Sequence, residues 1–392
     1  MPKKSLFIFG LTFFTVSFGV AAMAALIPSI AAYFGTEQVY TARLVWLYML
    51  PYGVFALFWS PLTRIIQVKK IIIFTTLGFC LSSLFFSLSQ TLRQAFVFRF
   101  LMGCFGCSFV PLLLITVGKT VPSVNKSKYI GTLFSLSYVS TCISVFLSGF
   151  LSWRIIYFIP AILSFVIFIL ILQHLEDFDF RSKTFKVSYL ETVKDKQALT
   201  FFIAIIAGSF LYHSIQQWLG VYLNKTYVLP QIVISLIFTV STVSSALFEF
   251  AGGIFSSRLG GIKITRVGFA MMSIFAFALF LLRQYQLFFL FIVLWGSGWA
   301  LTHVGLSSYL THFPDKTLRD ASSLNSALRF VAGGIGAFFG GFLISHIGFK
   351  PHFLIMGICI FILGCFLKRL LQGAESMSSF SLDKAATAEG MD

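Results

Sequence analysis

Charged side chains are scarce in this chain of 392 residues, and acidic ones are the scarcest. Asp, Glu, Lys and Arg together make up 11% of the residues, whereas a typical soluble domain carries roughly 25%. Only 13 residues are acidic. This composition excludes an ordinary soluble globular domain, and it also excludes a disordered chain, which would be polar and charged.

Cysteines are few as well, six in all, and each lies in an apolar segment. A secreted disulfide framework is therefore not expected. Cys104 and Cys107 form a C-x-x-C pair, but no second cluster of Cys or His accompanies it, so we expect no metal site. The sequence shows no phosphate-binding loop and no nucleophile constellation, and we expect neither a cofactor nor an enzymatic activity.

Apolar residues are abundant: 58% of the chain is hydrophobic, and 50 residues are Phe. They gather into twelve runs, and some 20 apolar residues in a helix cross a bilayer. A membrane β-barrel would show short alternating segments, which these runs are not. The sequence therefore predicts an all-α integral membrane protein with spans near 5–33, 44–63, 71–90, 94–118, 129–151, 154–173, 199–222, 230–255, 267–284, 287–309, 321–344 and 352–367.

The 29 Lys and Arg residues are distributed unevenly between the two sides of the predicted membrane. If the N-terminus is inside, 21 of them fall in cytoplasmic segments and six outside. Lys and Arg accumulate in cytoplasmic loops of membrane proteins. The net charge of +16 is thus a topology signal and does not indicate a nucleic-acid partner. We expect a multi-pass protein of a bacterial inner membrane, in contact with the lipid bilayer and with both termini in the cytoplasm.

The longest internal loop, 174–198, divides the spans into six plus six. The two halves resemble repeats, because residues 60–64 match 253–258 and residues 149–151 match 341–343 at offsets near 193 residues. The domain boundaries that follow are 1–173 for the first six-helix bundle, 174–198 for a cytoplasmic central loop, 199–372 for the second bundle and 373–392 for a disordered cytoplasmic tail.

Four segments, in order, resemble the major facilitator superfamily. The segment GGIFSSRLGGIK (252–263) resembles the family's Gly-rich loop at Gly253, Arg258, Gly260 and Lys263, although Ser257 replaces the usual acid. The other three are RFLMGCFGCSFVP (99–111), SGFLSWRIIYF (148–158) and RDASSLNSALRFVAGGIGAFFGGFL (319–343).

Within that family, LIPSIAAYFG (26–35) and SWR (152–154) resemble the twelve-helix drug–proton antiporter branch. The antiporter's Gly-Pro pair is missing from 139–149, which weakens antiport. The resemblance implies a monomer with two bundles around a central cavity that opens alternately to each side. It also implies that the first, fourth, seventh and tenth spans line the cavity and that the 252–263 segment is a conformational loop.

Arg99 lies within the fourth predicted span, where an arginine costs roughly 2.5–3.5 kcal/mol at the centre of a membrane helix. We therefore expect it to face a polar interior. It can serve as an anion contact or as an electrostatic stand-in for a proton-coupling partner. The alternative is a structural hydrogen bond to neighbouring carbonyl groups.

Glu249 is the only acid within any predicted span, and Arg329 lies at a similar depth. Counting along the helices at 1.5 Å per residue places each of them about 12–13 Å from the cytoplasmic face. We expect a Glu249–Arg329 ion pair near the cytoplasmic gate, with a structural or a proton-coupling role.

The seventh and tenth spans carry polar and aromatic residues at helical spacing. They can hold substrate or protons, or they can serve as packing between helices. With Thr15 of the first span, the candidate cavity residues are His213, Gln216, Gln217, Trp295, Trp299, Thr302 and His303.

Together these features predict secondary active transport of a small organic solute. The leading hypothesis is proton-coupled efflux. The first six spans contain no acid, which argues against a cationic substrate. The alternative is uptake or exchange of an anionic metabolite with Arg99 as the anion contact. A membrane-embedded enzyme or a non-transporting scaffold is the remote alternative, since Glu249 stands alone.

Overall fold

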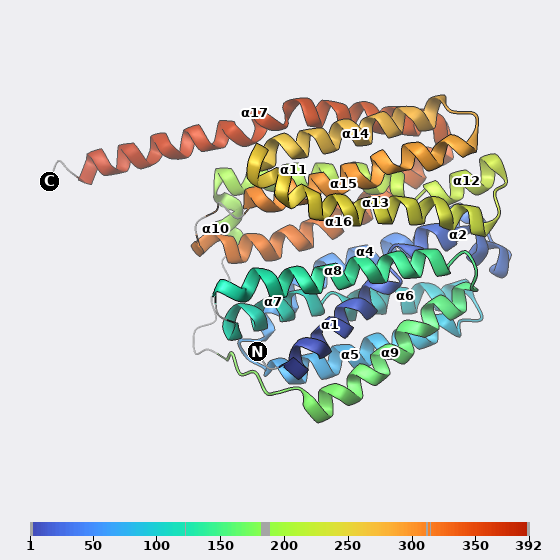
Figure 1. Ribbon diagram of the computed structural model, residues 1–392, viewed down its shortest axis with the longest axis horizontal. Helices are drawn as coiled ribbons and strands as arrows, with labels where there is room; N and C mark the ends of the chain where they lie inside the picture. The colour runs from blue at the N-terminus through green and yellow to red at the C-terminus, as the bar shows by residue number, and fades with distance from the viewer. Residues whose placement is uncertain (1–2, 122, 182–188, 311–312, 314, 390–392) are drawn as a thin grey trace.

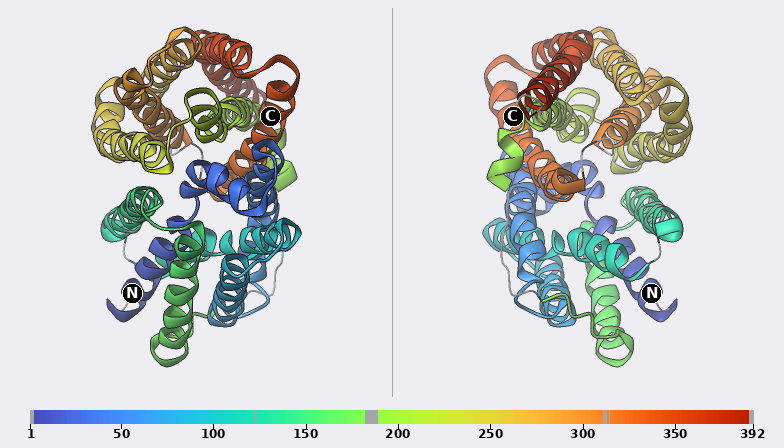
Figure 2. Two further views of the ribbon diagram at one scale, coloured as in Figure 1. Left: turned by 90° about the vertical axis from the view of Figure 1, so that its right-hand side faces the viewer. Right: turned by 90° about the vertical axis from the view of Figure 1, so that its left-hand side faces the viewer.

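The computed structural model describes residues 3–121, 123–181, 189–310, 313 and 315–389. These residues form helices and connecting loops without a strand, which confirms the all-α fold. The helices fall into two groups, seen end-on in Figure 2. The first group contains α1 (Lys3–Phe18), α2 (Ala22–Phe34), α3 (Gln38–Thr41), α4 (Arg43–Leu62), α5 (Val68–Ser87), α6 (Leu92–Gly106), α7 (Phe109–Thr120), α8 (Ser123–Leu147) and α9 (Trp153–His174).

The second group follows after a connecting segment. It contains α10 (Tyr189–Lys194), α11 (Lys196–Gln216), α12 (Leu219–Tyr227), α13 (Gln231–Leu259), α14 (Gly261–Leu281), a 3-10 turn at Tyr285–Leu287, α15 (Phe288–Leu310), α16 (Asp315–Ile347) and α17 (Phe349–Glu389). Both ends of the chain lie towards the same end of the molecule, on the left of Figure 1.

Within the described residues, ten helical segments are long and apolar enough to cross a membrane, and the bent α1–α2 pair adds an eleventh. The predicted span 129–151 corresponds to α8, whose described apolar part, Ser135–Leu147, is shorter. Every predicted span thus coincides with a helix or a broken helix. The number twelve and the cytoplasmic location of the termini stay predictions.

Short-range signals set several helix ends. Thr91 and Gln94 form a capping box at the start of α6, and the Ser152 hydroxyl accepts from the backbone N–H of Ile155 at the start of α9. Such caps satisfy amide groups that the helix itself leaves without a partner. Gly260, with φ of 87°, makes the turn between α13 and α14, a conformation that other residues rarely adopt.

Two spans at corresponding places in the two halves are broken. The first span bends by 46° between α1 and α2, and the seventh is interrupted at Gln217 and Trp218 between α11 and α12. The outer parts of these spans, α2 and α12, pack against each other (Figure 1). A Cβ added to Gly220 would meet the carbonyl oxygen of Ala24, so the contact is between backbones.

The two halves also meet along α4 with α16 and along α8 with α13. In the α4–α16 contact, the ring of Tyr52 stacks on that of Phe330 with centroids 3.9 Å apart. Gly53 lies directly against the backbone at Ala327 and Val331. Small residues of this kind let membrane helices approach closely.

Polar contacts join the two halves at the end away from the termini. Gln38 Nε2 donates to Asn224 Oδ1 at 2.6 Å, and Ser29 donates to Gln231 Oε1 at 3.2 Å. Lys225 Nζ lies 3.4 Å from Glu37 Oε1. The two halves are therefore in direct contact at this end.

Two further segments, the central segment and the C-terminal tail, lie outside the predicted spans. The central segment 174–198 contains a short helix, α10, whose Tyr189 hydroxyl donates to the carbonyl of Leu57. The helix α17 extends past residue 372 as far as Glu389, and the disorder expected for the tail 373–392 stays a prediction. The Ala-rich stretch near the end of the chain is compatible with a helix.

The glycines of α16 make a stability test possible. A Cβ at Gly336 would meet the backbone of Phe210 on α11, and a backbone cannot turn aside as a flexible side chain can. We expect Gly336→Ala to lower the free energy of unfolding by about 1–3 kcal/mol, seen as a lower melting temperature in detergent. Gly253→Ala is the matched control, because nothing lies within 4 Å of its Cβ. A melting temperature of Gly336→Ala equal to that of the control would contradict this packing.

Candidate functional site

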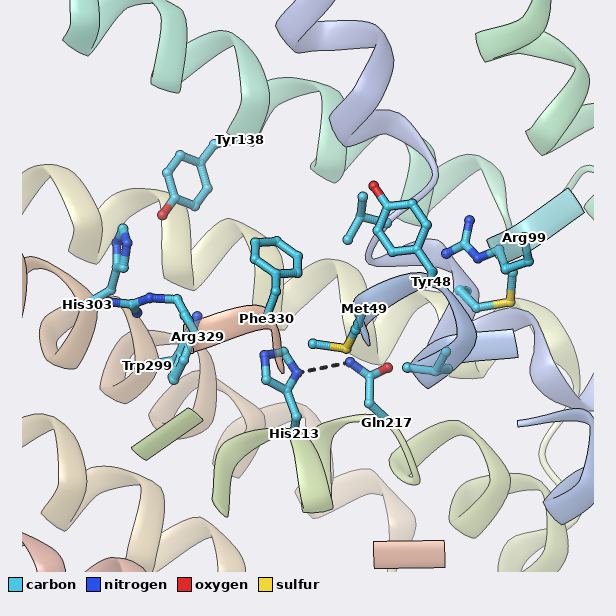
Figure 3. Close-up of a pocket in the computed structure, with 13 residues that line it drawn as sticks. Tyr48, Met49, Arg99, Tyr138, His213, Gln217, Trp299, His303, Arg329 and Phe330 are labelled. Atoms are coloured by element: carbon cyan, nitrogen blue, oxygen red, sulfur yellow. Dashed lines mark hydrogen bonds between the residues drawn. The ribbon is translucent and has the colours of Figure 1, made fainter. Parts of the chain in front are cut away.

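A central cavity of about 210 Å³ lies between the two halves (Figure 3). The predicted first, fourth, seventh and tenth spans line it, as the resemblance implies, and so do the second, fifth and eleventh. Its lining residues are Val20, Met23, Val45, Tyr48, Met49, Arg99, Tyr138, His213, Gln217, Trp299, His303, Arg329 and Phe330.

Glu249 and His303 form a close pair at one end of the cavity. His303 Nδ1 lies 2.6 Å from Glu249 Oε1, and their side chains are 30% and 20% exposed. The second carboxylate oxygen of Glu249 is buried without a hydrogen-bond partner. A carboxylate and an imidazole at this distance form a hydrogen bond, which is charge-assisted when either group is ionised.

The expected direct Glu249–Arg329 ion pair is not what the structure shows. Arg329 Nη2 donates to Asn325 Oδ1 at 3.3 Å, and its guanidinium carbon lies 5.7 Å from the centre of the Trp299 ring. Arg329 still interacts electrostatically with Glu249. Counting along straight helices gives depth but not lateral position, and His303 on α15 is the nearer neighbour of α13.

Aromatic rings build one wall of the cavity. Trp299 stacks on Tyr212 with centroids 3.9 Å apart, and Tyr212 in turn stacks on Trp295 at 4.9 Å. Trp295 is fully buried, and its Nε1 donates to Gln216 Oε1 at 2.6 Å. Trp299 therefore faces the cavity, while Trp295 and Gln216 support it from behind.

His213 and Gln217 lie together at the break between α11 and α12. Gln217 Nε2 is 3.1 Å from His213 Nδ1 (Figure 3). Since an amide nitrogen only donates, the imidazole accepts at Nδ1, which leaves Nε2 as its donor. The polar stripe predicted on the seventh span thus supplies two cavity residues.

Arg99 lies at the opposite end of the cavity from Arg329 (Figure 3). Its side chain is 2% exposed, and its Nε donates to the carbonyl of Leu44 at 3.3 Å. The guanidinium carbon lies 4.3 Å from the centre of the Tyr48 ring and 5.2 Å from that of Tyr157. The structural hydrogen bond weighed at the sequence level is therefore present, and Arg99 also lines the cavity.

Some predicted cavity residues lie elsewhere. The Thr15 hydroxyl donates to the carbonyl of Leu11, and that of Thr302 donates to Gly298; both are about 1% exposed. Tyr48 and Tyr138 also line the cavity. The sequence did not predict them, because a tyrosine in an apolar run carries no signal of a binding site.

The predicted conformational loop lies at the α13–α14 turn, outside the cavity lining. Gly253, Arg258 and Lys263 are exposed there, and a Cβ at Gly261 would meet the carbonyl oxygen of Gly305. The glycines of this segment thus allow a tight turn and a close helix contact.

The charge balance of the cavity is positive. Two arginines line it, and the described residues place no ion-paired carboxylate on either of them, since Glu249 pairs with His303. The same residues contain no group of three or more His, Cys, Asp or Glu that could hold a metal ion. The site therefore offers positive charge, aromatic surface and one carboxylate–imidazole pair.

A model of the Major Facilitator Superfamily matches residues 9–336 and 233–382. The chain belongs to this superfamily. It is accordingly a multi-pass membrane transporter, with a small molecule as its substrate, and not an enzyme. The family model does not distinguish the drug–proton antiporter branch from other branches.

Solved structures support the fold. The human organic anion transporter MFSD10 (TETRAN) superposes with a TM-score of 0.74 at 10% identity, covering 94% of this chain and 100% of that one. A bacterial homolog of the human lysosomal transporter Spinster reaches 0.73 at 13%, covering 94% and 96%. The nucleoside transporter NupG reaches 0.72 at 15%, covering 94% and 100%. No curated protein sequence matches the chain.

The Glu249–His303 contact can be tested by a double-mutant cycle. We expect Glu249→Gln and His303→Gln to be non-additive, with a coupling energy of about 0.5–3 kcal/mol, because residues in contact couple. The measurement is thermal unfolding of the single and double variants in detergent. A second cycle with Glu249→Gln and Arg329→Gln is the comparison. A larger coupling energy in this second cycle would support pairing of Glu249 with Arg329 and contradict its contact with His303.

Proposed function

We propose that the chain carries a small organic anion together with protons across the membrane by alternating access. The observation that carries this proposal is that two arginines line the cavity and that, among the described residues, neither forms an ion pair, although Glu249 acts on Arg329 electrostatically. A charge held away from water is stabilised by an opposite charge, and a substrate anion provides it. The chain would act as a monomer in a bacterial inner membrane, where the excess of basic residues in the predicted cytoplasmic loops agrees with the usual bias.

The size and lining of the cavity narrow the substrate class. Its volume of about 210 Å³ lies below the roughly 300–1,000 Å³ of sites for drug-sized ligands. The stacked Trp299 and Tyr212 offer a flat apolar surface. A small acid with an apolar or aromatic body fits these features better than a bulky or cationic drug.

Electrostatics favours movement of the proton and the anion in the same direction. A proton on the Glu249–His303 pair adds one positive charge to the cavity and so strengthens anion binding. Linkage is reciprocal, so the bound anion strengthens proton binding equally. The carrier with both the proton and the anion bound is then the more stable form. Where the proton gradient is directed inwards, the anion is therefore taken up together with the proton.

Proton-coupled efflux is the second candidate. The resemblance of LIPSIAAYFG (26–35) to the antiporter branch favours it. In that mechanism the proton and the solute occupy the cavity in turn, so the two candidates give opposite responses to one imposed pH gradient.

Transport into proteoliposomes tests the proposal. We expect benzoate uptake to rise when the outside is made acidic, and benzylamine uptake to show no such rise. Glu249→Gln should abolish the response to the pH gradient but keep benzoate exchange, because only the proton site is removed. Arg93→Gln, an exposed change, is the control. Accumulation driven by an acidic interior would favour antiport, and preference for benzylamine would refute an anionic substrate.

A further inference from the structure

We infer that the carboxylate head group of the substrate binds at the break in the first span, between Arg99, the Tyr48 hydroxyl and the start of α2. This inference rests on the proposed anion transport and assigns its head-group site. The apolar body would then point along the cavity towards Trp299 (Figure 3). The Glu249–His303 pair, of which His303 lines the cavity, would stay free for the proton.

Arg99 has bonding capacity left that faces the cavity. Its Nε is used by the carbonyl of Leu44, and the rings of Tyr48 and Tyr157 contact the guanidinium. Among the described residues, the terminal nitrogens Nη1 and Nη2 have no acceptor. These two nitrogens form the fork that binds a carboxylate through two parallel hydrogen bonds.

Tyr48 supplies a second donor without a partner. Its side chain is 1% exposed, it lines the cavity beside Arg99, and its hydroxyl makes no hydrogen bond in the described part of the chain. Buried hydroxyl groups are nearly always paired. The hydroxyl oxygen is covered in this conformation, so the Tyr48 side chain would have to move for a ligand oxygen beside Arg99 to become its acceptor.

The start of α2 adds a positive end of a helix to the same place. The helix has 13 residues and begins at Ala22, and its N-cap residue, Ala21, offers no side-chain cap. Val20 and Met23 at this end line the cavity with Arg99. The free N–H groups and the helix dipole favour an anion there.

Tyr157 holds these parts together. Its hydroxyl donates to the carbonyl of Gly19 at 2.7 Å, which lies in the break, and its ring lies under the Arg99 guanidinium. A purely structural role for Arg99 accounts for Nε and for the ring contacts. It leaves Nη1, Nη2 and the Tyr48 hydroxyl unexplained, and a bound carboxylate accounts for all three.

Binding of benzoate to the full-length protein in detergent tests the site, with benzamide as the neutral isostere. The readout is the concentration dependence of the melting temperature, since a ligand that binds the folded state raises it. We expect saturable stabilisation by benzoate and none by benzamide. Tyr48→Phe should weaken benzoate binding about tenfold, because a hydrogen bond to a charged group is lost. Arg99→Gln should remove the binding.

The ligand-free melting temperature separates binding from structure. Tyr48→Phe removes a buried hydroxyl that has no partner, so the stability of the free protein should stay unchanged or rise while benzoate binding falls. Tyr52→Phe, one helical turn further along α4 and outside the cavity lining, is the matched control and should bind benzoate like the wild type. Arg93→Gln is the control for Arg99→Gln.

The outcomes distinguish the site from the proposed function. Unchanged benzoate affinity in both Tyr48→Phe and Arg99→Gln, with loss in Arg329→Gln, would overturn the head-group site and leave anion transport standing. Equal responses to benzoate and benzamide, or no response to benzoate in the wild type, would overturn both. Weaker benzoate binding in Tyr48→Phe with unchanged free stability would support the site.

Discussion

The free-energy cost of keeping two arginine side chains away from water is the constraint that governs the rest of this structure. Arg99 and Arg329 lie in membrane helices and line the cavity, where a cation without compensation is expensive. The protein offsets that cost only in part, with one carbonyl, one amide and several aromatic faces. The only acid in the predicted spans, Glu249, is paired with His303. The excess positive charge that remains at the centre of the protein is the basis of the proposed anion transport.

Close packing between the two halves surrounds that centre. Broken spans place the ends of helices, with their free amide groups, beside the cavity, while close glycine contacts bring the outer segments together. Rings fill the space where α4 crosses α16. The apolar bulk excludes water from most of the interface, so the few polar groups at the cavity act in a medium of low dielectric constant, where each counts more.

Much of this arrangement could be predicted from the sequence, because a charge or a polar stripe inside an apolar run is itself informative. Arg99, His213, Gln217, Trp299, His303 and Arg329 were found in this way and lie in the cavity. Thr15 and Thr302 were misleading because a threonine can satisfy its hydroxyl on its own helix. The contact of Glu249 with His303 was not predicted, because helix rotation is set by packing, which spacing along the chain does not reveal. Tyr48 and Tyr138 carried no signal among so many aromatic residues.

The tie from Tyr157 to Gly19 has a mechanical consequence. One rigid side chain connects the bend of the first span to the ring platform under Arg99. The angle of that bend and the position of the guanidinium are therefore not independent coordinates. If the first span straightens or rotates while the carrier turns over, the ring must follow or the bond must break. Tyr157 thus links the backbone of the first span directly to the position of the Arg99 guanidinium.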